Sequence, residues 1–401
     1  MQNQNRKIRI AHIITDLTSS GSSSMLYKLM AHIDRSRFDP VIIALDSEGE
    51  FIDKIIAHAI PVYTFNMSRN PSSSWHVLRL ARLLRKLEPD ILQGWMYQGN
   101  LAASLASKLL AKRPALLWNV RQAVYNLQQE PRSTRWAIGF SQRLMSMPDR
   151  ILYNSWLSEN QHVSLGFDEQ KSQIVANGFD LQLFAPNTYS RELMRMKLAI
   201  PQDAIAIGMI AHYCPTKNHA LFMEAAHLLG IHNRNVHFIL AGEQVSTDNP
   251  EIAALLKRFP ALQGKLHLLG KRQDIPALMN ALDMFTLTAM RGDGFPNAVG
   301  EAMACGVPCI ATDIGDTALL INKTGQTLQE ATPSSLAFAW QEWINAGEIW
   351  RKEQGRQARK RIQKHYAIQN ITSQYQDIYQ SLDQKRLGDT NASTEPLKFA
   401  N

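Results

Sequence analysis

The chain has 401 residues, 45 % of them hydrophobic and 19 % charged, and its formal net charge at pH 7 is +8. At about 100 to 200 residues per domain, this length predicts two domains with sizeable hydrophobic cores, which excludes a disordered or collagen-like chain. The three cysteines form no even framework and no Cys-x-x-Cys pair. This excludes a disulfide scaffold and a zinc-ribbon protein, and it suits a reducing compartment.

The N-terminal segment from Met1 to Lys7 is polar, and the apolar run that follows is too short for the core of a signal peptide. No apolar run approaches the roughly 18 to 20 residues that a membrane span needs. We therefore expect a cytoplasmic protein, which could also lie peripherally on the inner face of the cell membrane. Six of the eight net positive charges fall in the first 183 residues, a bias that favours anionic lipids, phosphorylated ligands or nucleic acid without choosing among them.

Short apolar runs alternate with amphipathic, helix-length stretches over the first 180 residues. The expected strands, in chain order, are Ile8–Ile14, Val41–Leu45, Pro61–Phe65, Ile91–Gly94, Leu116–Val120 and Ile151–Tyr153. Helical patterns such as Trp75–Leu87 and Asn100–Leu110 lie between them. Strands that are apolar on both faces and separated by helices predict a parallel α/β sheet, so we expect a first doubly wound, Rossmann-like domain over residues 1–180.

Turn and breaker residues from Asn177 to Asn187 mark the expected hinge, and a second alternation follows. Its expected strands are Ile205–Ala211, His237–Ala241, Lys265–Leu269, Met284–Thr288 and Cys309–Ala311. They predict a second Rossmann-like domain over residues 181–365 and a ligand site in a cleft outside the strand ends. We expect a helix over 366–382 to pack back on the first domain, and the polar segment 383–401 to form a disordered tail.

The most informative stretch runs from Gly292 to Pro308, where an apolar strand leads through a glycine-rich loop into a helix that should begin near Pro296 or Asn297. The N–H groups and the dipole of such a helix start favour an anion such as a diphosphate. Glu301, one turn further in, could accept hydrogen bonds from the vicinal hydroxyls of a ribose, and Asp293 from a sugar hydroxyl. Taken alone, these are also the ordinary acidic residues of a helix start.

Lys217 lies at a second junction between a strand and a helix. A cation near a helix start opposes the helix dipole unless an anion is bound beside it. A solvated lysine is the simpler interpretation of one residue, but two such junctions in the same domain both indicate a phosphate ligand.

In these residues the chain resembles the retaining glycosyltransferases of family 4, which have the GT-B fold of two Rossmann-like domains facing a central cleft. The resemblance extends from Ile8 to about Tyr379. The motifs that carry it are Asp16-Leu17 to Gly21 with Leu26, Asn177-Gly178-Phe179-Asp180, Lys217, Ala241-Gly242-Glu243, Leu269-Gly270-Lys271-Arg272 with Asp274, the Glu-x7-Glu region and Gly306-Val307-Pro308.

The resemblance implies a hexosyltransferase that uses neither a cofactor nor a metal ion, acting in surface polysaccharide or glycolipid synthesis. Its partners would be a nucleotide-sugar donor, with UDP favoured, and a saccharide or lipid-linked acceptor. The donor pyrophosphate would lie between Gly21, Lys217 and the backbone of Phe295, Pro296 and Asn297. Glu301 would hold the nucleotide ribose, Asp293 the transferred sugar, and Leu269 to Arg272 the base.

Several positions depart from the family pattern. Ser20-Gly21-Ser22-Ser23 stands in place of Gly-Gly-Ala-Glu, and Gln98 and Gln122 replace two frequent histidines. His212 stands where an arginine commonly faces the diphosphate, and Asp293 replaces a glutamate, which shortens its reach by roughly 1.5 Å. We assign Asp293 and Gln122 as catalytic positions, His212 to the donor site, and Ser22, Gln98 and Arg121 to the acceptor side.

Two other functions stay open at this stage: a degenerate family member that acts as a binding or scaffold subunit, and a GT-B nucleotide-sugar epimerase. A dehydrogenase is excluded because no Gly-x-Gly-x-x-Gly follows the first strand. Nucleic-acid binding has only the charge excess in its favour. The arginines of Trp75–Leu87, with Arg132, Arg135 and Arg143, indicate an anionic membrane surface, whereas the leucines of that helix are typical of packing on a sheet.

Overall fold

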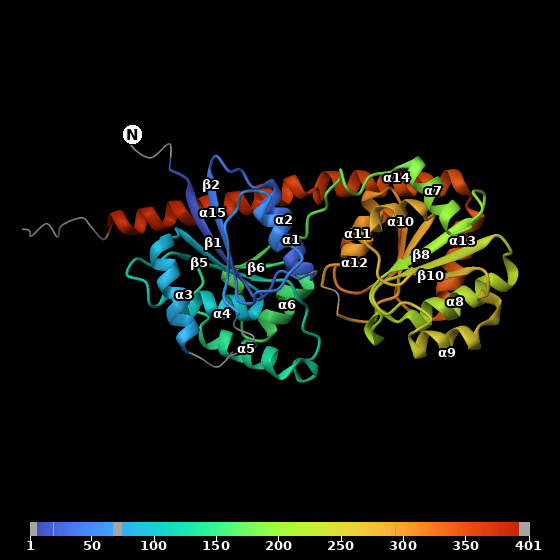
Figure 1. Cartoon of the computed structure of the whole chain (residues 1–401). Coiled ribbons are helices and arrows are strands. Elements are labelled where there is room, and N and C mark those ends of the chain that lie inside the picture. The colour runs from blue at the N-terminus through green and yellow to red at the C-terminus, as the bar shows by residue number, and fades with distance from the viewer. Residues whose placement is uncertain (1–5, 19, 67–73, 293, 393–401) are drawn as a thin grey trace, which may run out of the picture. The chain divides into compact units, whose positions relative to one another are not determined.

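The computed structural model describes residues 6–18, 20–66, 74–292 and 294–392, and it divides into two compact units. Unit 1 comprises the chain up to Gly178 together with the segment from Ile368 onward, and unit 2 comprises Phe179–Ala367. Each unit contains one parallel sheet flanked by helices (Figure 1). The predicted α/β class with two doubly wound sheets is therefore confirmed.

The sheet of unit 1 has seven parallel strands in the order β3-β2-β1-β4-β5-β6-β7. Its strands are β1 Ile8–Ile14, β2 Phe38–Ala44, β3 Val62–Thr64, β4 Ile91–Trp95, β5 Ala115–Val120, β6 Arg150–Tyr153 and β7 Ser172–Ile174. Its α-helices are α1 Gly21–His32, α2 Ile52–Ile56, α3 Ser74–Leu87, α4 Met96–Ser107, α5 Arg132–Arg143, α6 Trp156–Ser164 and α15 Ile368–Ala392. The strand order reverses between β1 and β4, whose pairing aligns Ile10 with Ile91.

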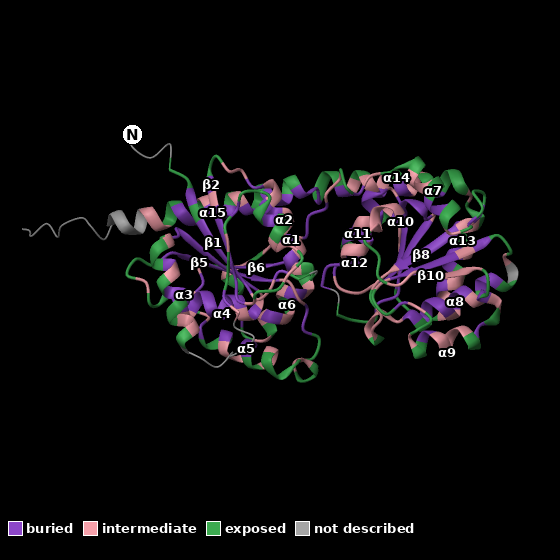
Figure 2. Ribbon diagram, viewed as in Figure 1, coloured by how far each residue is buried: buried purple, intermediate pink, exposed green. Residues whose placement is uncertain are grey.

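Two apolar cores cover the two faces of this sheet. One contains side chains of α1 and α15, including Leu26 and Tyr375. The other contains side chains of α3, α4 and α5, including Leu84, Leu101 and Ile138. Figure 2 shows the result, with buried residues on the strands and exposed residues on the outer sides of the helices.

The sheet of unit 2 has six parallel strands in the order β10-β9-β8-β11-β12-β13, the order of a Rossmann domain. Its strands are β8 Ile205–Ile210, β9 Val236–Ala241, β10 Leu266–Leu268, β11 Met284–Leu287, β12 Cys309–Thr312 and β13 Gln326–Leu328. Its α-helices are α7 Thr188–Lys197, α8 His219–His232, α9 Pro250–Arg258, α10 Ile275–Ala281, α11 Asn297–Ala304, α12 Thr317–Ile321, α13 Pro333–Asn345 and α14 Glu348–His365.

The edge strands β7 and β13 were not expected from the sequence. Each has three residues, of which two are polar, and each pairs with a neighbour on one side. A short edge strand needs no continuous apolar run because it is not enclosed by strands on both sides. The apolar-run criterion therefore misses it.

Helix α15 extends into the segment that the sequence predicts to be a disordered tail. It continues to Ala392, so the expectation of disorder from residue 383 is wrong for residues 383–392, while residues 393–401 lie outside the described part. An ion cluster holds the helix beyond residue 382: Arg386 lies 2.6 Å from Asp90 and 2.9 Å from Asp383, and Arg6 also bonds to both carboxylates. These partners are 84 to 377 residues from Arg6 in sequence, so a local composition argument could not find them.

Candidate functional site

The reversal of strand order in unit 2 lies between β8 and β11. In doubly wound sheets, ligands bind outside the carboxyl ends of the strands at this point. The loop after β8 carries His212 and leads through a 3-10 turn, Pro215–Lys217, into α8. The loop after β11 passes Gly292 and leads into α11. The predicted donor residues of these two loops are thus brought to one edge of one sheet.

Thr288 links the two loops. Its buried hydroxyl lies 2.9 Å from the carbonyl oxygen of Lys217 and 3.1 Å from that of Asn218. The backbone N–H of Met290 also donates to the carbonyl of Thr216, at 2.8 Å. These bonds fix the turn that presents Lys217 relative to the loop that presents α11.

Helix α11 begins directly after the loop that follows β11. Its N-cap is Pro296, which makes no side-chain capping bond, and its first helical residue is Asn297, as the sequence predicts. Backbone N–H groups at such a start, together with the helix dipole, suit an anionic ligand. Glu301 lies one turn further along the same helix and is half-buried.

The position of α11 depends on an aromatic cluster beneath it. Phe295 is buried, and its ring stacks on Phe179 at a centroid distance of 6.1 Å and contacts Tyr366 at 5.7 Å. Gly300 allows α11 to approach Phe179, because a Cβ there would lie 2.0 Å from the ring. Any role of Phe295 in ligand binding must therefore come from its backbone, since its side chain belongs to the packing.

Three loops at the carboxyl ends of β8, β9 and β10 are bonded to one another. The N–H of Gly242 donates to the carbonyl of Gly270 at 2.8 Å, and that of Leu269 to Leu240 at 3.0 Å. Gly242 has φ +155°, and a Cβ there would lie 2.0 Å from the carbonyl oxygen of Ala211, so glycine is required. The N–H of Tyr213 also donates to the carbonyl of Glu243 at 2.8 Å, so the loop of Gly242 lies between the loop of Leu269 and the loop of His212.

The charged groups around these loops differ in environment. Arg272 forms a bidentate pair with Asp274, at 2.9 and 2.7 Å, which lowers the pKa of that carboxyl. His212 is exposed and Lys217 is half-buried. His219, the first residue of α8, is buried, and burial lowers its pKa to about 4, so its imidazole is neutral at pH 7.

The predicted residues of unit 1 lie at the carboxyl ends of its strands. Gly21 and Ser22 form the first turn of α1, whose N-cap Ser20 accepts a hydrogen bond from the N–H of Ser23 at 3.3 Å. Gln98 lies in the first turn of α4, directly after β4. Gln122 follows β5 and donates to Glu130 at 3.0 Å. Their predicted functions stay predictions.

Arg121 is a half-buried cation with neutral partners. Its guanidinium donates to Asn119 at 3.2 Å, to the hydroxyl of Tyr375 at 2.8 Å and to the side chain of Asn177. Its Nε is buried without a hydrogen-bond partner among the described residues. Burial lowers the pKa of Arg121. The residue therefore ties β5 to α15 and to the start of the Asn177-Gly178-Phe179-Asp180 motif.

Asp293, the other predicted catalytic residue, lies outside the described residues. Its neighbours are described: Gly292 has φ +96°, and the carbonyl of Gly294 accepts the N–H of buried Asp316 at 3.0 Å.

Comparison with known proteins decides the family. The model for "Glycosyltransferase Family 4" matches residues 19–183, and the model for "Glycosyl transferases group 1" matches residues 201–345. Together they span about three quarters of the chain and follow one another in the order of its two units. The chain belongs to the family 4 glycosyltransferases.

Two relatives of the glycosyltransferase are named for transfer to lipid-linked saccharides. An Escherichia coli UDP-Gal:alpha-D-GlcNAc-diphosphoundecaprenol alpha-1,3-galactosyltransferase is 25 % identical over 80 % of this chain and 84 % of the relative. The N,N'-diacetylbacillosaminyl-diphospho-undecaprenol alpha-1,3-N-acetylgalactosaminyltransferase of Campylobacter jejuni is 27 % identical over 70 % of this chain and 74 % of the relative.

The fold of the glycosyltransferase matches solved structures. Anabaena HepE in complex with UDP aligns with a TM-score of 0.80 and 20 % identity, over 93 % of this chain and all of that one. The likeness confirms the predicted GT-B fold. Among the described residues, no helix combines the length and the hydropathy that crossing a membrane requires.

Three buried polar residues in or beside the loops after β8 and β11 were not selected from the sequence: Thr288, Asp316 and His219. Thr288 was expected to end a strand, and the structure places it one residue after β11. A polar residue directly after a central apolar strand is the one signal that could have indicated its role. The sequence around Asp316 and His219 gives no comparable signal, because their positions depend on contacts between loops that are distant in sequence.

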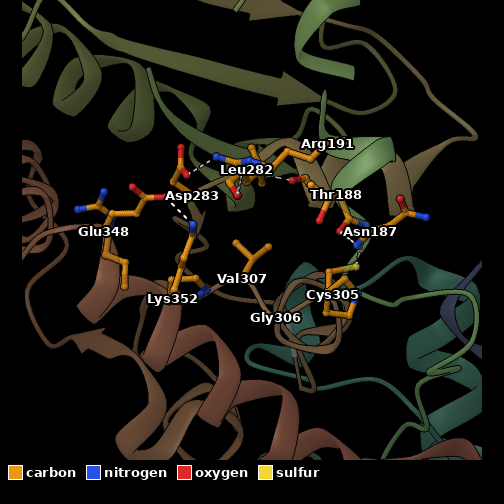
Figure 3. Close-up of a pocket in the computed structure, with 14 residues that line it drawn as sticks. Asn187, Thr188, Arg191, Leu282, Asp283, Cys305, Gly306, Val307, Glu348 and Lys352 are labelled. Carbon is orange, nitrogen blue, oxygen red and sulfur yellow. Dashed lines mark hydrogen bonds and ion pairs between the residues drawn. The ribbon is translucent and has the colours of Figure 1, made fainter. Parts of the chain in front are cut away.

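A separate pocket of about 190 Å³ in unit 2 contains none of the predicted site residues (Figure 3). It lies near the amino ends of β11 and β12, where Asp283 precedes one strand and Pro308 the other. Four of its five charged groups pair within the pocket, with Arg191 2.6 Å from Asp283 and Lys352 2.6 Å from Glu348. Burial raises the pKa of the Cys305 thiol on its wall to about 12. The Arg191–Asp283 pair joins α7 to the amino edge of the sheet, whereas the Lys352–Glu348 pair lies within α14.

Proposed function

We propose that this glycosyltransferase moves a hexose from a UDP-sugar to a lipid-linked saccharide, with retention of anomeric configuration, during synthesis of a surface polysaccharide or glycolipid. The observation that carries the proposal is the meeting of Lys217 and the start of α11 at the β8/β11 reversal, with Glu301 one turn away. The named relatives support the choice of acceptor class, since both act on diphosphoundecaprenol-linked saccharides.

In unit 2, the α11 backbone and Lys217 would bind the donor diphosphate, and the Glu301 carboxylate would accept hydrogen bonds from two ribose hydroxyls. Hydrogen bonds to a charged group contribute about 1.5 to 3 kcal/mol each. Leu269 and the backbone that follows it would contact the base. The Arg272 side chain is paired with Asp274, so its part in the base pocket would be limited to its backbone.

In the transfer, the bond between the anomeric carbon and the UDP oxygen breaks, and a bond forms to an acceptor hydroxyl oxygen. The leaving phosphate would take the acceptor proton, which requires no protein base. This accords with Gln122, because an amide side chain cannot act as a general base at neutral pH. Lys217 would offset the charge that develops on the diphosphate.

On the acceptor side, Arg121 is the residue suited to an anionic group. Arg121 is half-buried, its Nε is fully buried, and its described partners include no carboxylate, so a ligand phosphate would offset part of the cost of desolvating its charge. The acceptors of the named relatives carry a diphosphate. We therefore propose that Arg121 contributes to recognition of the acceptor diphosphate, and that the enzyme works at an anionic membrane surface where such a lipid resides.

Titration calorimetry with UDP and GDP tests the donor site. We expect UDP to bind the wild type, and Glu301→Ala to weaken that binding by about a hundredfold or more through loss of two charged hydrogen bonds. Glu342→Ala, which removes an exposed carboxylate on α13, is the matched control and should bind as the wild type does. Equal UDP affinity in Glu301→Ala and the wild type would contradict the assignment.

A further inference from the structure

The solvent side of α3 is both basic and apolar. The helix contains no acidic residue. Its exposed side chains are Trp75, Leu78, Arg79, Arg82, Arg85 and Lys86. Trp75 is 55 % exposed and Leu78 44 %, although both are large apolar groups. Leucines on the opposite side pack into the core of unit 1. The exposed side therefore combines four cations with two groups that water solvates poorly.

A cavity of about 260 Å³ lies between this helix and the edge strand β3. It is lined by Tyr63, Thr64, Phe65, Arg79, Arg82, Leu83 and Lys86. The three cations in this lining, Arg79, Arg82 and Lys86, are spaced by three and four residues, so they lie on one side of α3. None of the described residues that line the cavity is acidic.

Aromatic rings hold two of these cations in place. The guanidinium of Arg79 lies 4.8 Å from the ring centroid of Phe65, and that of Arg82 lies 5.1 Å from Trp75. Cation–π contacts of this length orient the guanidinium plane. Like charges gathered in one concavity repel each other, and arginine donors match phosphate oxygens in geometry. The concavity is thus suited to a phosphate group.

Helix α5 extends the same pattern on the same side of the sheet. It also has no acidic residue, and Trp136 is 65 % exposed while stacking on Phe140 at 5.2 Å. Arg132 and Arg143 are exposed as well. Both α3 and α5 pack against α4, so the two helices lie on one side of the sheet of unit 1 (Figure 1).

We propose that the cavity between β3 and α3 binds the phosphate of an anionic phospholipid headgroup, while Trp75 and Leu78 enter the membrane interface and Trp136 makes a second contact. The inference rests on the proposed function in one respect, since a lipid-linked acceptor requires the enzyme to work at a bilayer. Each exposed aromatic ring supplies apolar area at the interface, and each nearby cation adds about 1 kcal/mol of attraction to an anionic surface.

Vesicle flotation of the full chain tests this site. Vesicles of phosphatidylcholine alone are compared with equimolar phosphatidylcholine and phosphatidylglycerol. We expect flotation only with the anionic vesicles, and at least a tenfold loss of binding in the triple variant Arg79→Gln, Arg82→Gln, Lys86→Gln. Trp75→Ala should weaken binding without changing net charge. The matched control Lys197→Gln, Lys257→Gln, Lys323→Gln removes three exposed cations from unit 2 and should float as the wild type does.

Calorimetry with UDP separates this proposal from the proposed function. The α3 triple variant should bind UDP as the wild type does, which also shows that unit 2 is folded. Failure of the wild type to bind UDP would overturn the donor assignment and leave the flotation result intact. Equal flotation with neutral and anionic vesicles, or by the triple variant and the wild type, would overturn the lipid site. So would binding of inorganic phosphate to the cavity without vesicle binding, which would indicate a soluble phosphate ligand.

Discussion

At the scale of single residues, Gly300 sets how closely α11 approaches Phe179. A Cβ at this position would lie 2.0 Å from the Phe179 ring, so Gly300→Ala must displace either the ring or the helix. Overpacking of this kind costs about 1 to 3 kcal/mol. We expect Gly300→Ala to lower the free energy of unfolding by that amount and to weaken UDP binding, because the start of α11 moves.

Denaturant unfolding of Gly300→Ala beside Gly139→Ala checks this prediction. Gly139 lies in α5, and a Cβ there would have no atom of the described residues within 4 Å beyond its own helix, so alanine should stabilise the helix by up to about 1 kcal/mol. If both substitutions changed stability in the same direction, Gly300 would have no special packing role.

Arg121 is a second residue whose role can be separated from packing. Lysine keeps the charge but loses the planar donors that now contact Asn119, Tyr375 and Asn177. If Arg121 recognises the acceptor diphosphate, Arg121→Lys should raise the KM for the acceptor about tenfold or more and leave UDP affinity unchanged. A lower kcat with an unaltered acceptor KM would instead indicate a purely structural residue.

At the scale of elements, Thr288 joins the loops that follow β8 and β11. Valine is close to threonine in shape but lacks the hydroxyl that bonds the Lys217 and Asn218 carbonyls. We expect Thr288→Val to destabilise unit 2 by about 1 to 3 kcal/mol and to weaken UDP binding, since these partly buried carbonyl groups lose their donor.

Thr372→Val provides the contrast. Its buried hydroxyl has no hydrogen-bond partner in the described part of the chain, so valine there should be neutral or stabilising. Thermal unfolding and UDP calorimetry of both variants make the comparison. Unchanged UDP affinity in Thr288→Val would show that the two loops keep their geometry without this link.

At the scale of the whole molecule, buried histidines make stability depend on pH. Burial lowers the pKa of His12 to about 3 and of His162 to about 4. In the unfolded chain a histidine has a pKa near 6.5. Between these values the unfolded state binds a proton that the folded state does not, so the free energy of unfolding falls as the pH drops below 6.5.

His12 alone should account for about 2 kcal/mol of the stability lost between pH 7 and pH 5. His12→Gln keeps an acceptor for the Trp95 indole N–H, now 3.1 Å from Nδ1, but has no proton to gain. Denaturant unfolding at both pH values should therefore give a smaller pH dependence for this variant. A dependence equal to that of the wild type would place the titration elsewhere.

Much of this architecture follows from the sequence, because long apolar runs and helical periodicity are local properties. The start of α11 at Asn297 is an example, since a strand, a glycine-rich loop and proline precede it. Other features depend on distant partners. The extension of α15 depends on Arg6 and Asp90, and the packing of Arg121 on Asn177 and Tyr375. No pattern in the residues next to them in sequence predicts such contacts.

The most direct test of the proposed function is transfer itself. Purified wild type and Glu301→Ala are incubated with UDP-galactose or UDP-N-acetylgalactosamine and GlcNAc-diphosphoundecaprenol, and the product is analysed by NMR. We predict an α-linked disaccharide lipid from the wild type and a rate at least about a hundredfold lower from Glu301→Ala at low donor concentration. Release of free hexose without a lipid product, or equal rates for the two proteins, would contradict the proposed transfer.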